Sequence, residues 1–205
     1  MVDAKNHWEN IYSTKASDAV SWYRPRLETS LSLIRRVAEE KSSIIDVGAG
    51  SSTLADDLLN SGYRDITALD ISEAALESVK QRIEPIAQQV QWIAADITSY
   101  SLPTKAYDVW HDRAVFHFLT QKEQRVAYIR NLLNAMKNGG HVIISTFASD
   151  GPQKCSGLDV VRYDAESLQK ELGPQFRLVE SLREVHNTPF GTTQDFIYCL
   201  FALKS

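Results

Sequence analysis

The sequence predicts an α/β fold in which a mostly parallel sheet is covered by helices on both faces. Short apolar segments, which have the pattern of strands buried on both faces, alternate with segments of helical periodicity. This alternation is typical of parallel strands joined by crossover helices. The chain then closes on two strand-like segments, 176–186 and 194–203, whose connection is too short for a helix. We expect these two strands to be antiparallel.

Five strands are expected before the closing pair. Most of them are short and apolar on both faces, as strands between two helix layers should be. They cover residues 43–47, 65–69, 90–94, 107–111 and 141–147.

The helices expected between these strands have recognisable ends. They cover residues 52–61, 73–83, 121–137 and 166–172. Gly62 can adopt the left-handed conformation that ends the first helix. Ser72 is expected to cap the second. Thr120 followed by Glu123 has the pattern of a capping box for the third.

Length and composition indicate a single globular domain. The chain has 205 residues, of which 43% are hydrophobic and 23% charged. The net charge of −4 leaves no basic surface to neutralise phosphates, so nucleic acid is not expected as a partner. No signal peptide and no apolar run of about 18 residues is visible, which predicts a cytoplasmic chain without a membrane partner. Cys155 and Cys199 are expected to be free thiols.

A glycine turn follows the first expected strand, in the stretch SIIDVGAGSST. Gly48 and Gly50 allow a sharp turn and a close approach of the backbone to a ligand. In an open parallel sheet, ligands bind beyond the carboxyl ends of the strands. The strand ends and the positions after them carry a series of glycine and aspartate residues: Asp46, Gly48, Gly50, Asp70, Asp96 and Asp112. The sequence therefore predicts a nucleotide-cofactor site along this rim.

Two cofactors are compatible with a glycine turn followed by Asp70, whose carboxylate can accept both ribose hydroxyls: NAD and S-adenosylmethionine. The turn reads GAGSST and lacks the third glycine of the dinucleotide pattern. Asp46 would repel a pyrophosphate, whereas it suits a cofactor that carries an ammonium and a sulfonium. Asp96 offers an acceptor for the adenine amine. The balance favours S-adenosylmethionine, and an NAD-dependent oxidoreductase is the remoter alternative.

The stretch IIDVGAGSSTLADDLLNSGYRDITALDISEAALESVK resembles the class I S-adenosylmethionine-dependent methyltransferases. It is most similar to their branch of elongation-factor and citrate-synthase lysine methyltransferases, and HWENIY and VSWY fit the same branch. The resemblance covers residues 7–148. It implies the Rossmann-like class I methyltransferase fold, with a seven-stranded, mostly parallel sheet, an antiparallel last strand and helices on both faces. Residues 1–40 would form a lid and the first helices, and residues 41–205 the cofactor-binding core of the same domain.

The resemblance also implies a set of cofactor contacts along the rim and in the lid: Trp22, Asp46, Gly48, Ala49, Gly50, Asp70, Ile71, Asp96, Ile97 and Asp112. In this set the glycine turn holds the methionine end, Asp70 the ribose and Asp96 the adenine. Trp8, Tyr12 and Tyr23 would join Trp22 in the lid. The alternative for Trp8 and Tyr12, which are four residues apart, is the packing of a helix onto the core.

The candidate catalytic residues, at the end of the fourth expected strand and just after it, are His111, Asp112 and His117. Histidine is the natural general base near neutral pH, and His111 and His117 flank Asp112, which the resemblance places beside the methyl donor. Each histidine has a structural alternative as a hydrogen-bonded core residue. Candidate substrate contacts lie in the lid, after the fourth strand, in loop 149–162 and in the closing strands: Tyr12, Tyr23, Arg113, Lys154, Arg162 and His186. No cluster at ligand spacing indicates a metal.

The acceptor of the methyl group is expected to be a small molecule. The lysine branch reads D-K/R-G after the fourth strand and then an acidic residue, whereas this chain has Ala114 and later His117. Loop 149–162 has no clear counterpart in that branch. A protein lysine is therefore the alternative acceptor, and a catalytically silent cofactor-binding module is a third hypothesis.

Overall fold

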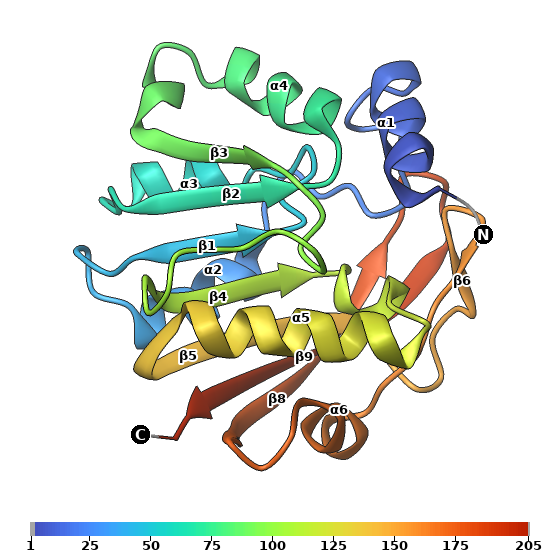
Figure 1. Cartoon of the computed structure of the whole chain (residues 1–205). Helices are drawn as coiled ribbons and strands as arrows, with labels where there is room; N and C mark the ends of the chain where they lie inside the picture. The colour runs from blue at the N-terminus through green and yellow to red at the C-terminus, as the bar shows by residue number, and fades with distance from the viewer. Residues whose placement is uncertain (1–2, 205) are drawn as a thin grey trace.

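The computed structural model describes residues 3–204 and places seven strands in one twisted sheet (Figure 1). The order across the sheet is β3-β2-β1-β4-β5-β9-β8. The strands are β1 (Ile44–Val47), β2 (Ile66–Asp70), β3 (Val90–Ala94), β4 (Tyr107–Arg113), β5 (Met136–Phe147), β8 (Phe176–Asn187) and β9 (Thr193–Leu203). Strands β1 to β5 pair in parallel, and β9 runs antiparallel between β5 and β8. The predicted fold class is confirmed.

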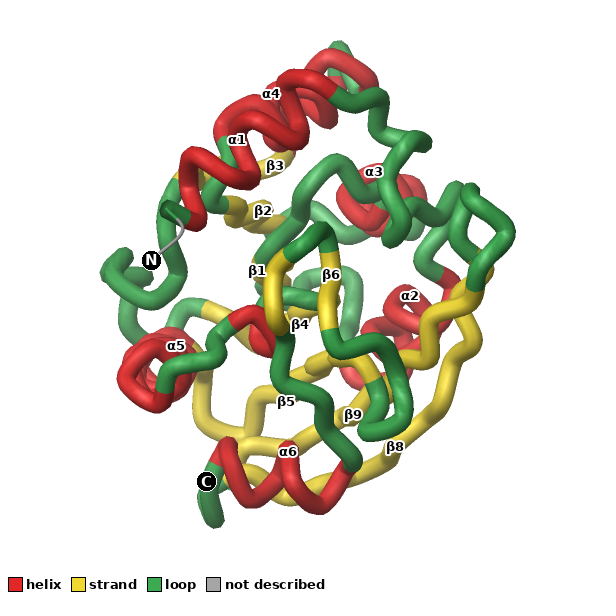
Figure 2. Tube along the Cα trace, turned by 90° about the vertical axis from the view of Figure 1, so that its right-hand side faces the viewer, coloured by secondary structure: helices red, strands yellow, loops and turns green. Residues whose placement is uncertain are grey.

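Helices cover both faces of this sheet. They are α1 (Ala4–Thr14), α2 (Glu28–Val37), α3 (Leu54–Asn60), α4 (Glu73–Arg82), α5 (Lys122–Ala135) and α6 (Ala165–Leu172). The apolar sides of α5 and α6 pack into one buried cluster, and those of α2, α3 and α4 pack into another on the opposite face. Figure 2 shows α5 on one side of the strands and α2 and α3 on the other. The rim between the two layers is where the carboxyl ends of the strands lie.

Three predicted helix ends can be compared with the structure. Ser72 caps α4, because its Oγ accepts the Ala75 N–H at 3.2 Å. Gly62, with φ +96°, follows the end of α3 as expected. The capping box of α5 is one residue later than predicted: the Gln121 N–H donates to Oε1 of Gln124 at 3.2 Å. Thr120 is not the cap, because its N–H still bonds to the carbonyl of Phe118 in the preceding turn.

The N-terminal segment lies over the carboxyl ends of the strands. Asp3 caps α1, where its Oδ1 accepts the N–H groups of Lys5 and Asn6. Helix α1 lies beside α4 (Figures 1 and 2), and Oε1 of Glu9 accepts the Ala74 N–H at 3.1 Å in the first turn of α4. This bond joins the segment to the rim. No helix within residues 3–204 has the length and apolar character needed to cross a bilayer.

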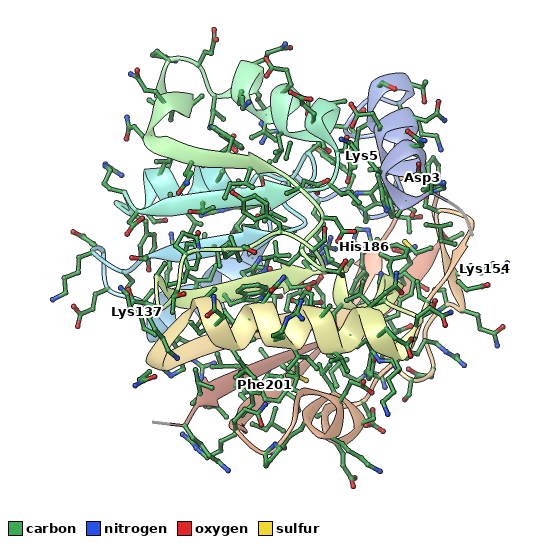
Figure 3. The ribbon with its side chains drawn as sticks, in the orientation of Figure 1. Asp3, Lys5, Lys137, Lys154, His186 and Phe201 are labelled. Carbon is green, nitrogen blue, oxygen red and sulfur yellow. The ribbon has the colours of Figure 1, made fainter. Side chains whose placement is uncertain are left out.

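A small hairpin, β6 (Lys154–Cys155) and β7 (Leu158–Asp159), stands at the same end of the molecule as α1. In Figure 3, Lys154 and His186 lie at this end, whereas Lys137 lies at the far end of the sheet. The loop after β5 and the turn after β8 therefore both reach the rim, as expected for a sheet in which β8 runs parallel to β5.

Candidate active site

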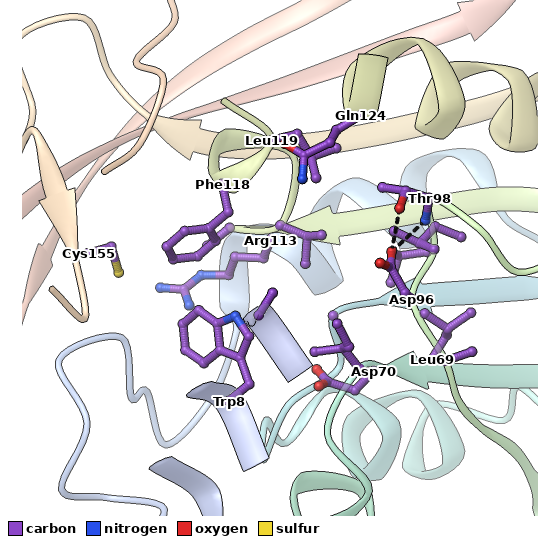
Figure 4. A pocket seen from close by; sticks show the side chains of 18 of the residues that line it. Trp8, Leu69, Asp70, Asp96, Thr98, Arg113, Phe118, Leu119, Gln124 and Cys155 are labelled. Atoms are coloured by element: carbon purple, nitrogen blue, oxygen red, sulfur yellow. Dashed lines mark hydrogen bonds between the residues drawn. The ribbon is translucent and has the colours of Figure 1, made fainter. Parts of the chain in front are cut away.

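A cavity of about 160 Å³ lies between the rim of the sheet and the N-terminal segment (Figure 4). A cavity of this size can hold an aromatic ring. Six of the predicted cofactor contacts line it: Trp22, Gly48, Asp70, Ile71, Asp96 and Ile97. A second, smaller hollow adjoins it over the glycine turn, and four residues line both spaces: Tyr12, Trp22, Gly48 and Arg113.

The turn after β1 requires both of its glycines. Gly48 has φ +72° and Gly50 φ +52°, a region that residues with a Cβ rarely adopt. A Cβ at Gly48 would lie 1.9 Å from Cγ2 of Val115, and one at Gly50 would lie 2.6 Å from the hydroxyl of Tyr12. The conformation of the turn and the close packing of Val115 and Tyr12 against it therefore both require residues without a side chain.

Asp70, at the end of β2, faces the glycine turn. One carboxylate oxygen accepts the Gly50 N–H and the other accepts the Ser72 N–H, each at 2.8 Å. Burial raises the pKa of Asp70 to about 6, against the lowering effect of these two hydrogen bonds. The side chain lines the cavity (Figure 4), so the remaining lone pairs of both oxygens can accept hydroxyl groups from a ligand.

Asp96 follows β3 and stands further along the same rim. Its Oδ1 accepts the backbone N–H of Thr98 at 2.8 Å and the Thr98 hydroxyl at 2.7 Å. These contacts, drawn in Figure 4, fix the carboxylate at the mouth of the cavity beside Ile97. A fixed acceptor next to an apolar side chain is suited to the edge and face of a purine.

Asp46 lies over the second hollow and is held by a histidine. Its Oδ1 is 2.6 Å from Nδ1 of His111, and Nε2 of His111 is 2.9 Å from the hydroxyl of Ser30. All three side chains are buried. Asp46, Ala49 and Gly50 line the hollow together with His111. Both ring nitrogens of His111 are occupied, so the structure gives this histidine a positioning contact with Asp46.

Asp112 lies outside both spaces, although its neighbours His111 and Arg113 line them. It is fully buried and accepts hydrogen bonds from the N–H groups of Val115 and Phe116 and, at 2.6 Å, from the hydroxyl of Tyr128. Burial raises the pKa of Asp112 to about 6. The structure therefore places Asp112, which was predicted both as a catalytic residue and as a cofactor contact, under the loop that follows β4 and outside both spaces.

His117 does not reach the cavity either. Its ring is fully buried and its Nδ1 accepts the Phe147 N–H at 3.2 Å. Burial, with a smaller effect of Arg113, lowers the pKa of His117 to about 3. The ring is neutral at physiological pH, and it packs against the rings of Phe118 and Phe147. It has the surroundings of a structural histidine.

The aromatic residues of the N-terminal segment pack on one another above the cavity. The ring of Trp8 lies 5.5 Å from that of Trp22 and 5.0 Å from that of Phe118, and Tyr12 lies 6.2 Å from Trp22. All four line the cavity. Trp8 and Tyr12 thus both face this space.

The predicted substrate contacts divide into two groups. Tyr23 and Arg113 join Tyr12 in the site. Lys154 is exposed and pairs with Asp159, and the exposed Arg162 donates to the carbonyl of Gly151.

His186 reaches the rim but not the site. Its Nδ1 accepts from Nε of Arg24 at 3.2 Å and its Nε2 lies 2.7 Å from the carbonyl of Ser21. It joins β8 to the N-terminal segment. The structure therefore does not bring His186, or the exposed lysine and arginine of the loop after β5, to the cavity.

Several lining residues were not predicted from the sequence: Thr98, Val115, Phe118, Leu119 and Gln124. Four of them follow the strand that ends in Arg113, and they come to the cavity because the chain turns back through a short 3₁₀ helix, Phe116–Phe118. In the sequence, only the apolar run after the fourth strand indicated that these residues could line the cavity.

Comparison with known proteins finds similarity to methyltransferases. Residues 44–140 match the family described as methyltransferase domain. A Drosophila melanogaster eEF1A lysine and N-terminal methyltransferase homolog is 25% identical over 144 residues, which are 67% of this chain and 21% of that protein. The chain is related to the class I S-adenosylmethionine-dependent methyltransferases. It spans about a fifth of the length of that relative.

Other methyltransferases are similar over more of their length. The EEF1A lysine methyltransferase 2 of Danio rerio is 27% identical over 162 residues, 74% of this chain and 61% of that protein. The 1,6-didemethyltoxoflavin-N1-methyltransferase of Burkholderia thailandensis, whose crystal structure holds 1,6-didemethyltoxoflavin and S-adenosylhomocysteine, superposes with a TM-score of 0.71 at 18% identity. That superposition covers 100% of this chain and 85% of the other, and it confirms the methyltransferase fold.

Proposed function

We propose that this protein is an S-adenosylmethionine-dependent methyltransferase that acts on a small-molecule acceptor. The observation that carries the proposal is the juxtaposition of a glycine turn that has no room for a Cβ with the carboxylate of Asp70, which bonds to the Gly50 N–H at 2.8 Å. The same cofactor is supported by the match to the methyltransferase domain family and by the methyltransferase relatives. It is also supported by a similar structure that holds S-adenosylhomocysteine.

The residues along the rim fit the parts of S-adenosylmethionine. Asp70 would accept the ribose hydroxyls, and Asp96 with Ile97 would hold the adenine. The methionine end would lie over Gly48, Ala49 and Gly50, in reach of the negative charge of Asp46. A diphosphate would meet that charge, and the turn lacks the third glycine of the dinucleotide pattern, so NAD fits less well.

We further propose that the part of residues 1–40 that carries Trp8 and Trp22 acts as a lid over the core of residues 41–205, while α2 packs on the sheet within the same domain. The bond between Glu9 and the first turn of α4 holds the segment beside the ribose end, and the rings of Trp8 and Trp22 stand over the cavity. A cover of aromatic rings excludes water from the site, which strengthens the electrostatic interactions inside it.

When bound, S-adenosylmethionine would supply an electrophilic methyl group on its sulfonium, with S-adenosylhomocysteine as the leaving group. The contribution of the protein is alignment and exclusion of water, and good alignment can lower a barrier by up to about 7–11 kcal/mol. Neither of the two candidate bases, His111 and His117, acts as the general base in this proposal, and His186 does not take that role either. His111 and His186 have both ring nitrogens bonded, and His117 lies outside the cavity. An acceptor that is nucleophilic at neutral pH needs no such base.

The charges in the site favour a small molecule over a protein lysine. Of the acidic residues that line the two spaces, Asp46 is bonded to His111, and Asp70 and Asp96 stand at the cofactor positions. Arg113 lies where the two spaces meet, and its cation would repel a lysine ammonium. The second candidate acceptor is nevertheless a protein lysine, because the relatives in Drosophila melanogaster and Danio rerio carry that name.

Two measurements test the proposal. Calorimetry with S-adenosylhomocysteine and NADH should show binding of the first and not of the second, and Asp70→Asn should weaken that binding. Incubation with methyl-labelled S-adenosylmethionine and a cell extract should then place label in the low-mass fraction. Label in the protein fraction would identify the alternative acceptor, and binding of NADH alone would contradict the methyltransferase proposal.

A further inference from the structure

The guanidinium of Arg113 is held by three groups in the wall between the two spaces. Its Nε donates to the hydroxyl of Tyr198 at 3.0 Å and its Nη1 donates to the carbonyl of Trp22 at 3.1 Å. Its Cζ lies 4.8 Å from the centre of the Phe196 ring. The third nitrogen, Nη2, is buried and has no hydrogen-bond partner within residues 3–204. The cation is therefore fixed in place with one donor group left over.

This cation also lacks an anionic partner. Arg24 is paired with Glu184 at 3.2 Å, and Arg125 with Glu171 at 2.7 Å, whereas no carboxylate in the described part of the chain forms an ion pair with Arg113. Arg113 is partly buried, and a charge that is removed from water is costly to the extent that it is not paired and hydrogen-bonded. The nearby thiol of Cys155 supplies no negative charge, because burial raises its pKa to about 12. The missing anion is therefore expected from a ligand.

The position of Arg113 separates it from the proposed cofactor contacts. Figure 4 shows its guanidinium between the rings of Trp8 and Phe118 and directed toward Cys155, while Asp70 and Asp96 stand on the other side of the cavity. Tyr198, which holds it, belongs to β9, on the far side of β5 from the nucleotide rim. The acceptor has to approach from this side if adenine and ribose occupy the side of β2 and β3.

We propose that the methyl acceptor carries a carboxylate that pairs with Arg113, beside an apolar or aromatic group that packs between Trp8, Trp22 and Phe118. This inference rests on the proposed function of the site. A single free nitrogen suits one carboxylate oxygen, whereas a phosphate dianion needs several donors. The carboxylate serves as a recognition group, and Arg113 is a specificity-determining residue for the proposed reaction.

Benzoate and its neutral isostere benzamide are the probes, because each combines a ring with the group to be compared. Calorimetry is carried out on the intact protein saturated with S-adenosylhomocysteine. The wild type should bind benzoate at least about tenfold more tightly than benzamide, as expected for a charge-assisted hydrogen bond in a site shielded from water. Equal binding of the two probes, or binding of neither, would overturn the inference.

Three variants locate the effect. Arg113→Gln should abolish the preference for benzoate, and Arg113→Lys, which keeps the charge, should retain part of it. Arg183→Gln removes an exposed guanidinium that pairs with Asp150 at 2.7 Å, and it should leave the preference unchanged. Thermal unfolding confirms that each variant folds. A preference that persists in Arg113→Gln would contradict the assignment.

The carboxylate of the cofactor itself is the other source from which Arg113 could receive an anion. A separate binding experiment distinguishes the cofactor carboxylate from that of the acceptor. Arg113→Gln should change the affinity for S-adenosylhomocysteine by less than about threefold, well below the tenfold that corresponds to 1.4 kcal/mol. A larger loss, with unchanged binding of 5′-methylthioadenosine, which lacks the amino-acid part, would show that Arg113 pairs with the cofactor and would overturn the inference. A wild type that binds no S-adenosylhomocysteine would instead contradict the proposed function, and this inference with it.

Discussion

The carboxylate of Asp46 and the imidazole of His111 form a buried pair, with Oδ1 and Nδ1 2.6 Å apart. They lie on neighbouring strands, β1 and β4, at positions that are in register. Ser30 of α2 closes the chain of contacts at the other ring nitrogen. The residue expected to meet the methionine end of the cofactor is thus oriented by a side chain that was expected to act as a base.

Replacement of His111 tests whether it positions Asp46. We expect His111→Ala to lower the free energy of unfolding by about 3 kcal/mol, because a buried carboxylate and a buried hydroxyl both lose their partner. The matched control is His141→Ala on β5, where the side chain is partly buried and the cost should stay below about 1 kcal/mol. Chemical denaturation measures both. Equal effects of the two substitutions would show that the pair contributes no more than an ordinary strand residue.

Introducing a methyl group into the glycine turn should remove cofactor binding. In Gly50→Ala the new Cβ would lie 2.6 Å from the hydroxyl of Tyr12, and the residue would have to keep φ +52°. We expect the affinity for S-adenosylhomocysteine to fall more than about tenfold, since the lid is displaced and the turn is strained by about 1–2 kcal/mol. Calorimetry provides the measurement.

Gly191→Ala is the control for this backbone strain. Gly191 has φ +76° in the turn between β8 and β9, and apart from its two chain neighbours no residue between 3 and 204 comes within 4 Å of the position of its Cβ. The strain alone should lower stability by about 1–2 kcal/mol and leave binding intact. Gly50→Ala that binds as well as Gly191→Ala would mean that the ligand does not lie on the turn.

The ionisation of Asp70 should make cofactor affinity depend on pH. Its pKa in the free protein is raised to about 6 by burial, and hydroxyl groups donate preferentially to the ionised carboxylate. The affinity for S-adenosylhomocysteine should therefore fall below pH 6, by at most about tenfold per pH unit for a single proton, and be constant above pH 7. Calorimetry from pH 5 to 8 on the wild type and on Asp70→Asn tests this, and the variant should lose the dependence.

The same carboxyl should affect the stability of the free protein in the opposite sense. Because the pKa of Asp70 is raised on folding, from 3.8 to about 6, the folded state binds more protons than the unfolded state in this interval. The contribution of Asp70 is complete below pH 4 and is lost as the pH rises through 6. The free energy of unfolding of wild type minus that of Asp70→Asn should therefore decrease from pH 4 to pH 6. An increase would contradict the raised pKa.

Ala114 has a backbone conformation that glycine favours. It follows Arg113 at the end of β4 with φ +70°, and its N–H bonds to the carbonyl of Ser145 at 2.8 Å, which keeps it there. We expect Ala114→Gly to raise the free energy of unfolding by about 1 kcal/mol by relieving this strain. The same exchange at Ala135 in α5 should lower stability by about 1 kcal/mol. Loss of stability in both variants would show that Ala114 is not strained.

The sheet and the cofactor rim could be predicted because they depend on local patterns. The strand expected at 90–94 is β3 to the residue, and the glycine turn and Asp70 lie at the carboxyl ends of neighbouring strands, as parallel pairing requires. Register and burial of these strands follow from their apolar composition. The position of the aspartates on the rim then follows from where each strand ends.

The catalytic assignments could not be predicted because they depend on which face of β4 each side chain takes. Side chains alternate along a strand. His111 and Arg113 thus face Ser30 and Tyr198 on one side of the sheet, and Asp112 faces Tyr128 on the other. These three consecutive residues look equivalent in the sequence. A shift of one residue along the strand would exchange the sides of the sheet that their side chains face. The N-terminal segment and the turn after β4 also form walls of the cavity. Their positions depend on tertiary packing, which leaves no periodic pattern in the sequence.

The insertion of β9 between β5 and β8 has a consequence for biosynthesis. The tyrosine that anchors the Arg113 guanidinium lies on this strand, 85 residues further along the chain. A growing polypeptide can assemble the nucleotide-binding half of the sheet early, yet it has to wait for residue 198 before the other half gains its fixed cation. Selectivity for the acceptor would then mature after the capacity to hold the methyl donor.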